Sequence, residues 1–356
     1  MNLFFLQSPI MLSRCLHVLE VLEQLEVGPE RVLKDKSNPL DYFNDNEFFS
    51  RYRFSKESVV FLFELIKNDS SLMQRSHAVP SMQQLLITLR FYATGHFQMS
   101  DGDLMEVNQS TVCRIIHRIS RCIARRKSNF ITSLSGDLTT KQEFYNIAGF
   151  PSVVGAIDCT HIPIVSPGGD AAEVYRNRKG FFSINVQAIC DANRIFKNVV
   201  ARWCGSTHDS RIFENSLVRD RFEDNEVNGF LLGDNGYACQ RYLMTPILHP
   251  ASNAERAYNK SHIKTRSRIE QAFGVLKQRF RCLQIPLRTN LSNSLVIIVA
   301  TFCLHNFALR RGDLCPPMMT VSDVQSETYD IGSMQQPSSL QGRAVRQQLV
   351  VEYFSD

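Results

Sequence analysis

The chain has 356 residues, 44% of them hydrophobic, so it has the length of about two domains and enough apolar side chains to bury a core. This composition excludes a small disulfide-stapled protein and a disordered tail. The net charge of +5, from 40 basic and 35 acidic residues, is too small for this chain length to identify a partner.

Ten cysteines occur singly in the sequence, with no Cys-x-x-Cys pair, which is typical of a reduced, intracellular protein. The longest apolar run, residues 295–304, is about half as long as a membrane-spanning helix needs to be. The N-terminus has apolar residues but lacks the basic segment and small-residue cleavage site of a signal peptide. We therefore expect neither secretion nor membrane insertion.

Residues 1–145 are predicted to form a helical domain. Apolar residues recur at the i, i+3, i+4, i+7 spacing of an amphipathic helix at 59–66 and again at 82–89. Stretches rich in β-branched residues are few in this part of the chain.

A helix-turn-helix-like segment is predicted at about 98–127, with a first helix at 103–107 and a second helix that begins at Gln109. A helix of this kind lies in the major groove of DNA with its N-terminal residues, here Gln109 and Thr111, at base edges. Four arginines spaced 4, 3 and 4 residues apart share a sector of about 60° on that helix, and they would meet phosphates: Arg114, Arg118, Arg121 and Arg125. A solvated basic face on an ordinary bundle helix is the alternative.

From residue 151 the chain changes to short runs of Val, Ile and Phe broken by Gly, Asp and Asn, which predict strands. Helical periodicity follows, so an α/β domain is predicted over residues 146–312. The last segment, 313–356, is polar and predicted to be a flexible linker with a short helix at 343–354. The predicted strands are 153–157, 181–190, 195–203 and 230–232, and the predicted helices are 210–221, 267–282 and 291–310.

Two carboxylates follow predicted strands and are candidates for metal binding. Asp158 comes directly after an apolar run, and Asp234 comes after the run at 230–232. A carboxylate buried there without a partner would cost on the order of several kcal/mol, and a metal ion would supply the missing charge. Carboxylates at the ends of adjacent strands can point into one site.

Glu270 lies on a predicted helix face that it shares with Gly274, Lys277 and Arg281. Gly274 would allow a close backbone approach, and the two cations are suited to phosphates. Hard cations such as Mg²⁺ prefer oxygen ligands, and two of them about 4 Å apart can activate water and stabilise the leaving oxygen in phosphodiester cleavage.

Other polar residues have two interpretations. Asp209 precedes a predicted helix, where it could be a fourth metal ligand or an ordinary N-cap. His161 and His208 flank carboxylates and could orient a substrate, although a single histidine is more often a satisfied polar group. His305, close to Cys303 in an apolar helix, favours core packing over nucleophilic chemistry.

The sequence resembles the transposases of the PIF/Harbinger superfamily and the nucleases derived from them. Six blocks in the family's order, spanning about 150 residues, carry this resemblance. They are V-G-A-I-D-C-T-H at 154–161, Y-R-N-R-K-G at 175–180, S-I-N-V-Q at 183–187, G-S-T-H-D-S-R at 205–211, L-G-D-N-G-Y at 232–237 and I-E-Q-A-F-G at 269–274, with Leu304-His305-Asn306 closing the domain.

The resemblance implies an RNase H-like DDE catalytic domain, a mixed sheet flanked by helices, preceded by an all-α domain. The family's acidic triad corresponds to Asp158, Asp234 and Glu270, with 35 residues between the second and third acids. It also implies a divalent cofactor, Mg²⁺ or Mn²⁺, and it raises Asp209 as a fourth ligand. The expected activity is metal-dependent cleavage of DNA, with a domesticated DNA-binding or adaptor protein that has lost turnover as the alternative.

Partners and location are likewise expected from the family. Its members act on DNA together with a separate Myb/SANT-like protein that assists DNA binding and nuclear entry. We expect location in the nucleus and also leave the cytoplasm open. Oligomeric state is left open as well, with a homo-oligomer allowed.

Overall fold

The computed structural model describes residues 38–69, 79–95, 107–313 and 339–355. The chain divides into two compact units, residues 1–42 and 43–356. In the first unit the described part is one short helix, α2 (Pro39–Tyr42). The other described elements belong to the second unit.

The N-terminal part of this unit is helical, as predicted. Asn44 begins the first of its helices with a capping box. Its side chain accepts a hydrogen bond from the Glu47 N–H, and the Glu47 side chain accepts one from the Asn44 N–H. The described helices are α3 (Asp45–Tyr52), α4 (Lys56–Ile66), α5 (Ser81–Thr94), α7 (Gln109–Arg125), α8 (Lys127–Phe130) and α9 (Leu138–Ala148). The predicted second helix of the helix-turn-helix is therefore confirmed as α7, whereas its predicted first helix falls almost wholly outside the described residues.

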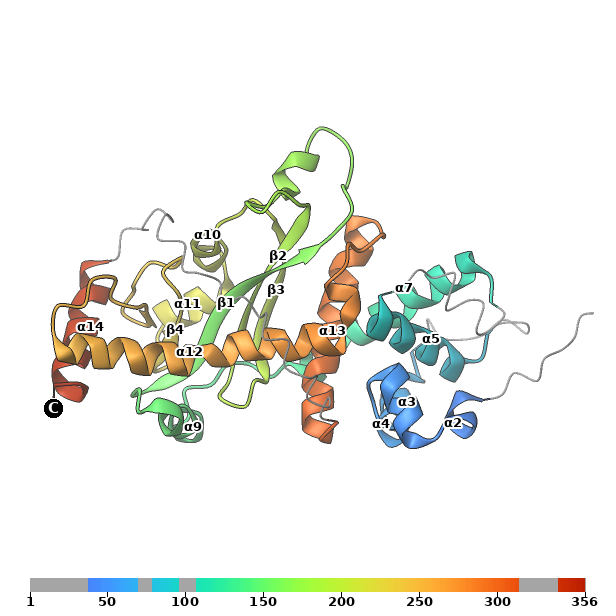
Figure 1. Cartoon of the computed structure of the whole chain (residues 1–356), viewed down its shortest axis with the longest axis horizontal. Coiled ribbons are helices and arrows are strands. Elements are labelled where there is room, and N and C mark those ends of the chain that lie inside the picture. The colour runs from blue at the N-terminus through green and yellow to red at the C-terminus, as the bar shows by residue number, and fades with distance from the viewer. Residues whose placement is uncertain (1–37, 70–78, 96–106, 314–338, 356) are drawn as a thin grey trace, which may run out of the picture. The chain divides into compact units, whose positions relative to one another are not determined.

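A five-stranded mixed sheet follows, in the order β3-β2-β1-β4-β5 (Figure 1). The central strand β1 is antiparallel to β2 and parallel to β4. The strands are β1 (Val153–Pro163), β2 (Ser183–Cys190), β3 (Phe196–Cys204), β4 (Phe230–Leu232) and β5 (Leu243–Met244). The predicted α/β fold class is confirmed, and the four predicted strands are present.

Each face of the sheet is covered by different helices. Ile157 and Ile189 are cross-strand partners in a buried cluster that also contains Phe213 of α10 (Asp209–Glu214) and Phe222 of α11 (Leu217–Glu223). Because side chains alternate along a strand, Asp158 points to the opposite face, where it contacts the helix α12 (Asn253–Arg279). The single helix predicted at 210–221 is thus two helices, the second capped by Ser216.

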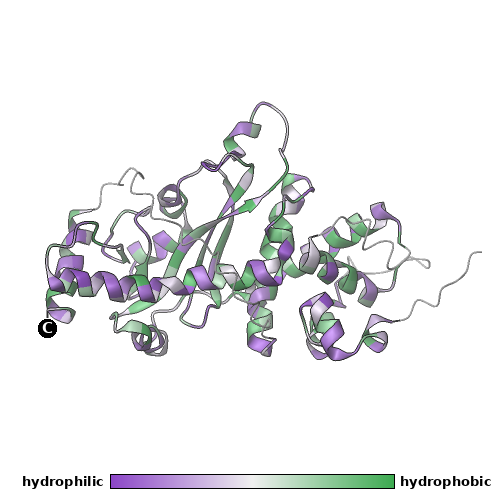
Figure 2. Ribbon diagram, viewed as in Figure 1, coloured by the Kyte–Doolittle hydropathy of each residue, from purple (hydrophilic) through white to green (hydrophobic). Residues whose placement is uncertain are grey.

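The long helix α12 begins at Asn253, not at the predicted residue 267, and Ser252 with Glu255 forms its capping box. It ends at Arg279, and residues 281–283 form a separate short turn of 3₁₀ helix. The positions that α12 buries in its first half include Ser261, His262 and Thr265. Figure 2 accordingly shows a largely hydrophilic helix crossing a sheet whose strands are mostly hydrophobic.

The last core helix, α13 (Leu291–Arg311), packs against α7 and against β3. It is long and apolar enough to cross a membrane, with a mean hydropathy of 1.6 over its most apolar window, but 72% of that window is buried inside the protein. Its side chains therefore serve as core.

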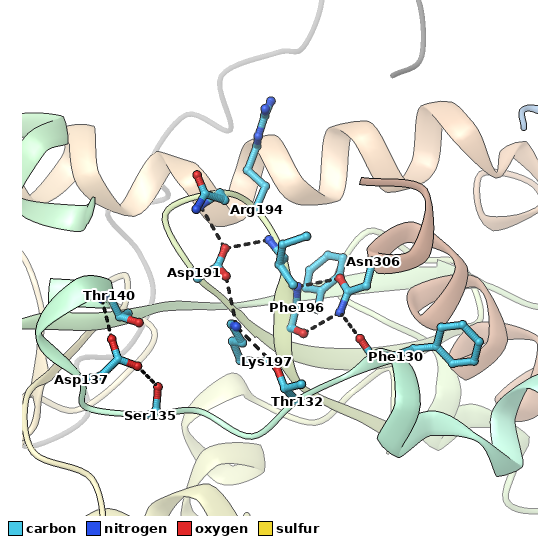
Figure 3. Close-up of polar contacts among 12 residues, drawn as sticks. Phe130, Thr132, Ser135, Asp137, Thr140, Asp191, Arg194, Phe196, Lys197 and Asn306 are labelled. Carbon is cyan, nitrogen blue, oxygen red and sulfur yellow. Dashed lines mark hydrogen bonds and ion pairs between the residues drawn. The ribbon is translucent and has the colours of Figure 1, made fainter. Parts of the chain in front are cut away.

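Asn306 of α13 joins this helix to the start of β3 by hydrogen bonds (Figure 3). Its carboxamide accepts a hydrogen bond from the Phe196 N–H at 2.8 Å and donates to the carbonyls of Phe196 and Phe130 at 2.7 and 3.1 Å. The neighbouring His305 is fully buried, bonds to the Arg194 carbonyl, and has its pKa lowered by burial to about 3. These contacts confirm the prediction that His305 belongs to the core.

The C-terminal helix α14 (Leu340–Tyr353) lies beside β5, and it covers the predicted helix at 343–354. Its N-cap Ser339 donates from its backbone N–H to the Cys239 carbonyl, and Arg346 donates to the Thr245 carbonyl. The helix therefore bonds to residues just before and just after β5 in the sequence. Within β5 the backbone N–H and carbonyl of Leu243 both bond to Gln240 of the same chain. The predicted linker lies mostly outside the described residues.

Candidate active site

One predicted acid lies on β1, and a second lies just beyond the end of the neighbouring strand β4, in a matching position. Ala156 of β1 pairs with Leu232 of β4, and Asp158 and Asp234 each follow two residues later. A tight turn holds Asp234, whose Oδ1 accepts from the Gly236 N–H at 3.0 Å, and a Cβ at Gly236 would come within 3.1 Å of that oxygen. The glycine therefore leaves the Asp234 carboxylate room to bond to the backbone.

Asp209 approaches the same region from α10. It is the first residue of that helix, whose N-cap is His208 without a side-chain bond, so the interpretation of Asp209 as an N-cap is wrong. Its Oδ1 instead accepts from Asn185 Nδ2 of β2 at 2.9 Å, and the same amide donates to the Thr207 carbonyl. Asn185 thus directs the carboxylate toward the sheet.

Two neighbouring aspartates act electrostatically on Asp158. Burial raises the pKa of Asp158 well above its usual range, and the negative charges of Asp234 and Asp209 raise it further, against the opposing effect of Arg266. The pKa of the Tyr237 hydroxyl is also raised, first by burial and then by neighbours that include all three aspartates. Asp209 and Asp234 therefore influence the charge of Asp158, although Asp158 points away from the face that α10 covers.

Glu270 is connected to this neighbourhood through an arginine that the sequence did not single out. Arg266 of α12 donates from Nη1 to Asp158 Oδ2 at 3.1 Å and from Nη2 to Glu270 Oε1 at 2.5 Å. The Arg266 side chain is 5% exposed, whereas that of Glu270 is 53% exposed. The spacing of four residues within one helix was the signal that could have identified this pair.

The donor chemistry of the four acids fits a hard divalent cation, because all are carboxylates and their mutual repulsion would be relieved by positive charge. Their arrangement in this structure does not by itself form such a site. Across the described ranges, no three Asp, Glu, His or Cys side chains lie close enough together to hold one ion. The assignment of Asp158, Asp209, Asp234 and Glu270 as metal ligands therefore stays a prediction.

Of the two residues predicted to contact phosphates, Lys277 lies on α12, whereas Arg281 lies beyond its end and so does not share a helix face with Glu270. Lys277 is half-buried, with its Nζ 3.5 Å from the His161 carbonyl of β1, and Arg281 is exposed beyond the end of the helix. A Cβ at Gly274 would meet nothing within 4 Å, so no described part of this chain uses the space there.

The two histidines have ordinary polar partners. His161 Nδ1 lies 3.0 Å from the Ser183 hydroxyl, and His208 is contacted by Arg178 from the β1–β2 connection. Gly205 lets this connection come close, since a Cβ there would lie 2.4 Å from the Tyr175 carbonyl oxygen. Both histidines fit the interpretation as satisfied polar groups.

The basic face of α7 is partly engaged within the protein. Ile115, Ile119, Cys122 and Ile123 are buried as predicted. Half-buried Arg118 donates to Gln84 Oε1 at 3.2 Å, and exposed Arg121 donates to Asn293 Oδ1 of α13 at 3.0 Å. Arg114 and Arg125 are also exposed, and the side-chain bonds of Arg114 go to Ser110 and Thr111 of its own helix. Gln109 is exposed at the start of the helix and Thr111 is half-buried.

This division predicts different roles for the four arginines. The double variant Arg114→Gln/Arg125→Gln is expected to weaken binding to all DNA sequences and to flatten the salt dependence of log Kd by about two units, because each lost phosphate contact releases about one counterion fewer. The matched variant Arg118→Gln/Arg121→Gln should leave that slope nearly unchanged and lower the melting temperature. Titrations at several salt concentrations distinguish them, and an unchanged slope for Arg114→Gln/Arg125→Gln would make α7 a structural helix.

Residues 157–306 match the family described as "DDE superfamily endonuclease". The chain is similar to "Putative nuclease HARBI1" of Homo sapiens, with 33% identity covering 89% of this chain and 93% of the relative. The Xenopus laevis protein of the same name is 30% identical, covering 89% and 92%, and "Protein ALP1-like" of Arabidopsis thaliana is 26% identical, covering 75% and 71%. No solved structure matches the chain.

Proposed function

The chain belongs to the Harbinger transposase-derived nucleases, a family with a DDE superfamily endonuclease domain, and from this premise we propose that it is a divalent-metal-dependent DNA endonuclease. The observation that supports this proposal is the placement of Asp158. It is a half-buried carboxylate on the central strand, and it experiences the charges of two further aspartates from β4 and α10. Fold stability alone does not require such a gathering of like charges.

In the proposed reaction the acids would hold two cations, and these would supply activation of a water molecule and stabilisation of the leaving oxygen of a phosphodiester. Asp158, Asp234, Asp209 and Glu270 would provide the ligands. Lys277 and Arg281 would bind DNA phosphates beside the acids, and α7 would bind the duplex at a second place.

The fourth ligand can be tested by thermal melting. Millimolar Mg²⁺ or Mn²⁺ is expected to raise the melting temperature of the wild-type protein, because a cation that binds only the folded state stabilises it. Asp209→Asn should lose most of this rise, since the amide lacks the charge. In EDTA the variant should melt like wild type, because its amide oxygen can still accept from Asn185. A drop in melting temperature that is the same with and without metal would show a structural role only.

The alternative is a DNA-binding or adaptor protein that retains the acids without turnover. One feature favours it, namely that Asp158 and Glu270 are both engaged by Arg266. Cleavage of supercoiled DNA with Mg²⁺ or Mn²⁺ supports the nuclease, and DNA binding without cleavage under any metal supports the adaptor. In either case we propose a Myb/SANT-like partner and a nuclear location with a cytoplasmic fraction, on the resemblance alone.

A further inference from the structure

The proposed reaction gives no role to Arg266, which contacts two of the acids. The turn of α12 before Glu270 directs its guanidinium toward β1, where the side chain is 5% exposed. Its two terminal nitrogens bond to oxygens of two different acids, Asp158 on the strand and Glu270 on the helix. A buried guanidinium is always charged and binds carboxylates through a rigid fork, so this contact is a fixed positive charge.

The oxygens that Arg266 engages belong to two of the carboxylates that would ligate a metal. Asp158 Oδ2 and Glu270 Oε1 cannot give the same electron pairs to a guanidinium and to a cation. Asp158 and Glu270 bond to this arginine, and Asp209 is held by the uncharged amide of Asn185. Arg266 therefore supplies positive charge at the centre of an otherwise repelling group.

We propose that Arg266 occupies the place of the cation in the metal-free protein, and that a divalent ion binds only when the guanidinium leaves Asp158 and Glu270. The inference rests on the proposed metal-dependent function. In this arrangement Arg266 stabilises the metal-free fold and weakens metal binding, and the two effects are linked because both arise from the same bonds. The exposure of Glu270, at 53%, leaves its side chain room to move when the pair separates.

The test compares Mn²⁺ binding by calorimetry and melting in EDTA for the full-length protein and three variants. Arg266→Met removes the charge and keeps an unbranched chain of similar length, and it should bind Mn²⁺ on the order of tenfold tighter than wild type and melt at a lower temperature in EDTA. Arg266→Lys keeps the charge without the fork, and it should bind Mn²⁺ with an intermediate affinity.

Arg268→Met is the matched control. This arginine lies two residues away on the same helix and bonds to Gln271 Oε1 instead of to the acids. Its substitution should change neither Mn²⁺ affinity nor the dependence of melting on metal.

The outcomes separate this inference from the function on which it rests. If wild type binds Mn²⁺ and neither Arg266 variant binds it more tightly, competition by Arg266 is refuted and the metal site stands. Binding by the Arg266 variants with none by wild type supports the inference in its strongest form. If wild type, Arg266→Lys and a folded Arg266→Met protein all fail to bind Mn²⁺, the metal site itself is refuted, and the inference with it.

Discussion

Replacing Asp158 with alanine is expected to abolish Mg²⁺- or Mn²⁺-dependent cleavage of supercoiled DNA, with a rate loss of roughly a thousandfold or more. Asp158 lies on the central strand, experiences the charges of Asp209 and Asp234, and bonds to Arg266, so its loss removes the acid to which the others are connected. Agarose-gel assays of nicked and linear products measure the loss. Glu214→Ala, an exposed acid at the far end of α10, should retain wild-type cleavage.

The same site makes a prediction about stability. Because the pKa of Asp158 is raised despite its contact with Arg266, its ionised form is unfavourable in the metal-free fold. Asp158→Asn should therefore melt in EDTA at the wild-type temperature or above it at neutral pH, and should show no rise with Mg²⁺. A variant that is destabilised in EDTA, together with a wild-type protein that does not respond to metal, would make the acid cluster structural.

Asn306→Ala is expected to lower the free energy of unfolding by about 3–5 kcal/mol, one of the largest effects of a single substitution in this fold. The change leaves the Phe196 N–H and the carbonyls of Phe196 and Phe130 without their side-chain partner in the interior. Urea unfolding followed by circular dichroism measures the change.

The control for Asn306 is Asn146→Ala on α9, where the amide is exposed and accepts one bond from Gln142. Its effect should stay within about 0.5 kcal/mol. A loss below about 1 kcal/mol for Asn306→Ala would mean that α13 and β3 are joined mainly by their apolar contacts.

The sequence predicted the strands β1 to β4 because each contains an apolar run bounded by turn residues, although β1 continues beyond the predicted 153–157 to Pro163 and so includes Asp158. The strand β5 could not be predicted, because its two residues, Leu243 and Met244, are too few to show the alternation of apolar and polar side chains that marks a strand. The first half of α12 was missed for a different reason. Its inward positions are filled by polar side chains such as Ser261 and Thr265, so the sequence lacks the apolar stripe that would mark a buried helix face.

The candidate site could also be predicted only in part from the sequence. Asp158 and Asp234 could be identified because each follows an apolar run, and their proximity depends only on strand pairing. The contact between Arg266 and Asp158 joins residues far apart in sequence and depends on how α12 lies across β1. An arginine four residues before a glutamate usually indicates an exposed pair on one helix, so its second partner could be seen only in the folded chain.

The bonding of β5 bears on how copies of this protein could assemble. An open sheet edge offers unpaired backbone groups to a strand from another molecule. At this edge the backbone of Leu243 is already bonded to Gln240, and α14 lies alongside. Within the described part of the chain, the Leu243 backbone is therefore not open to a strand from a second subunit, so we do not expect self-assembly by strand pairing on the β5 side.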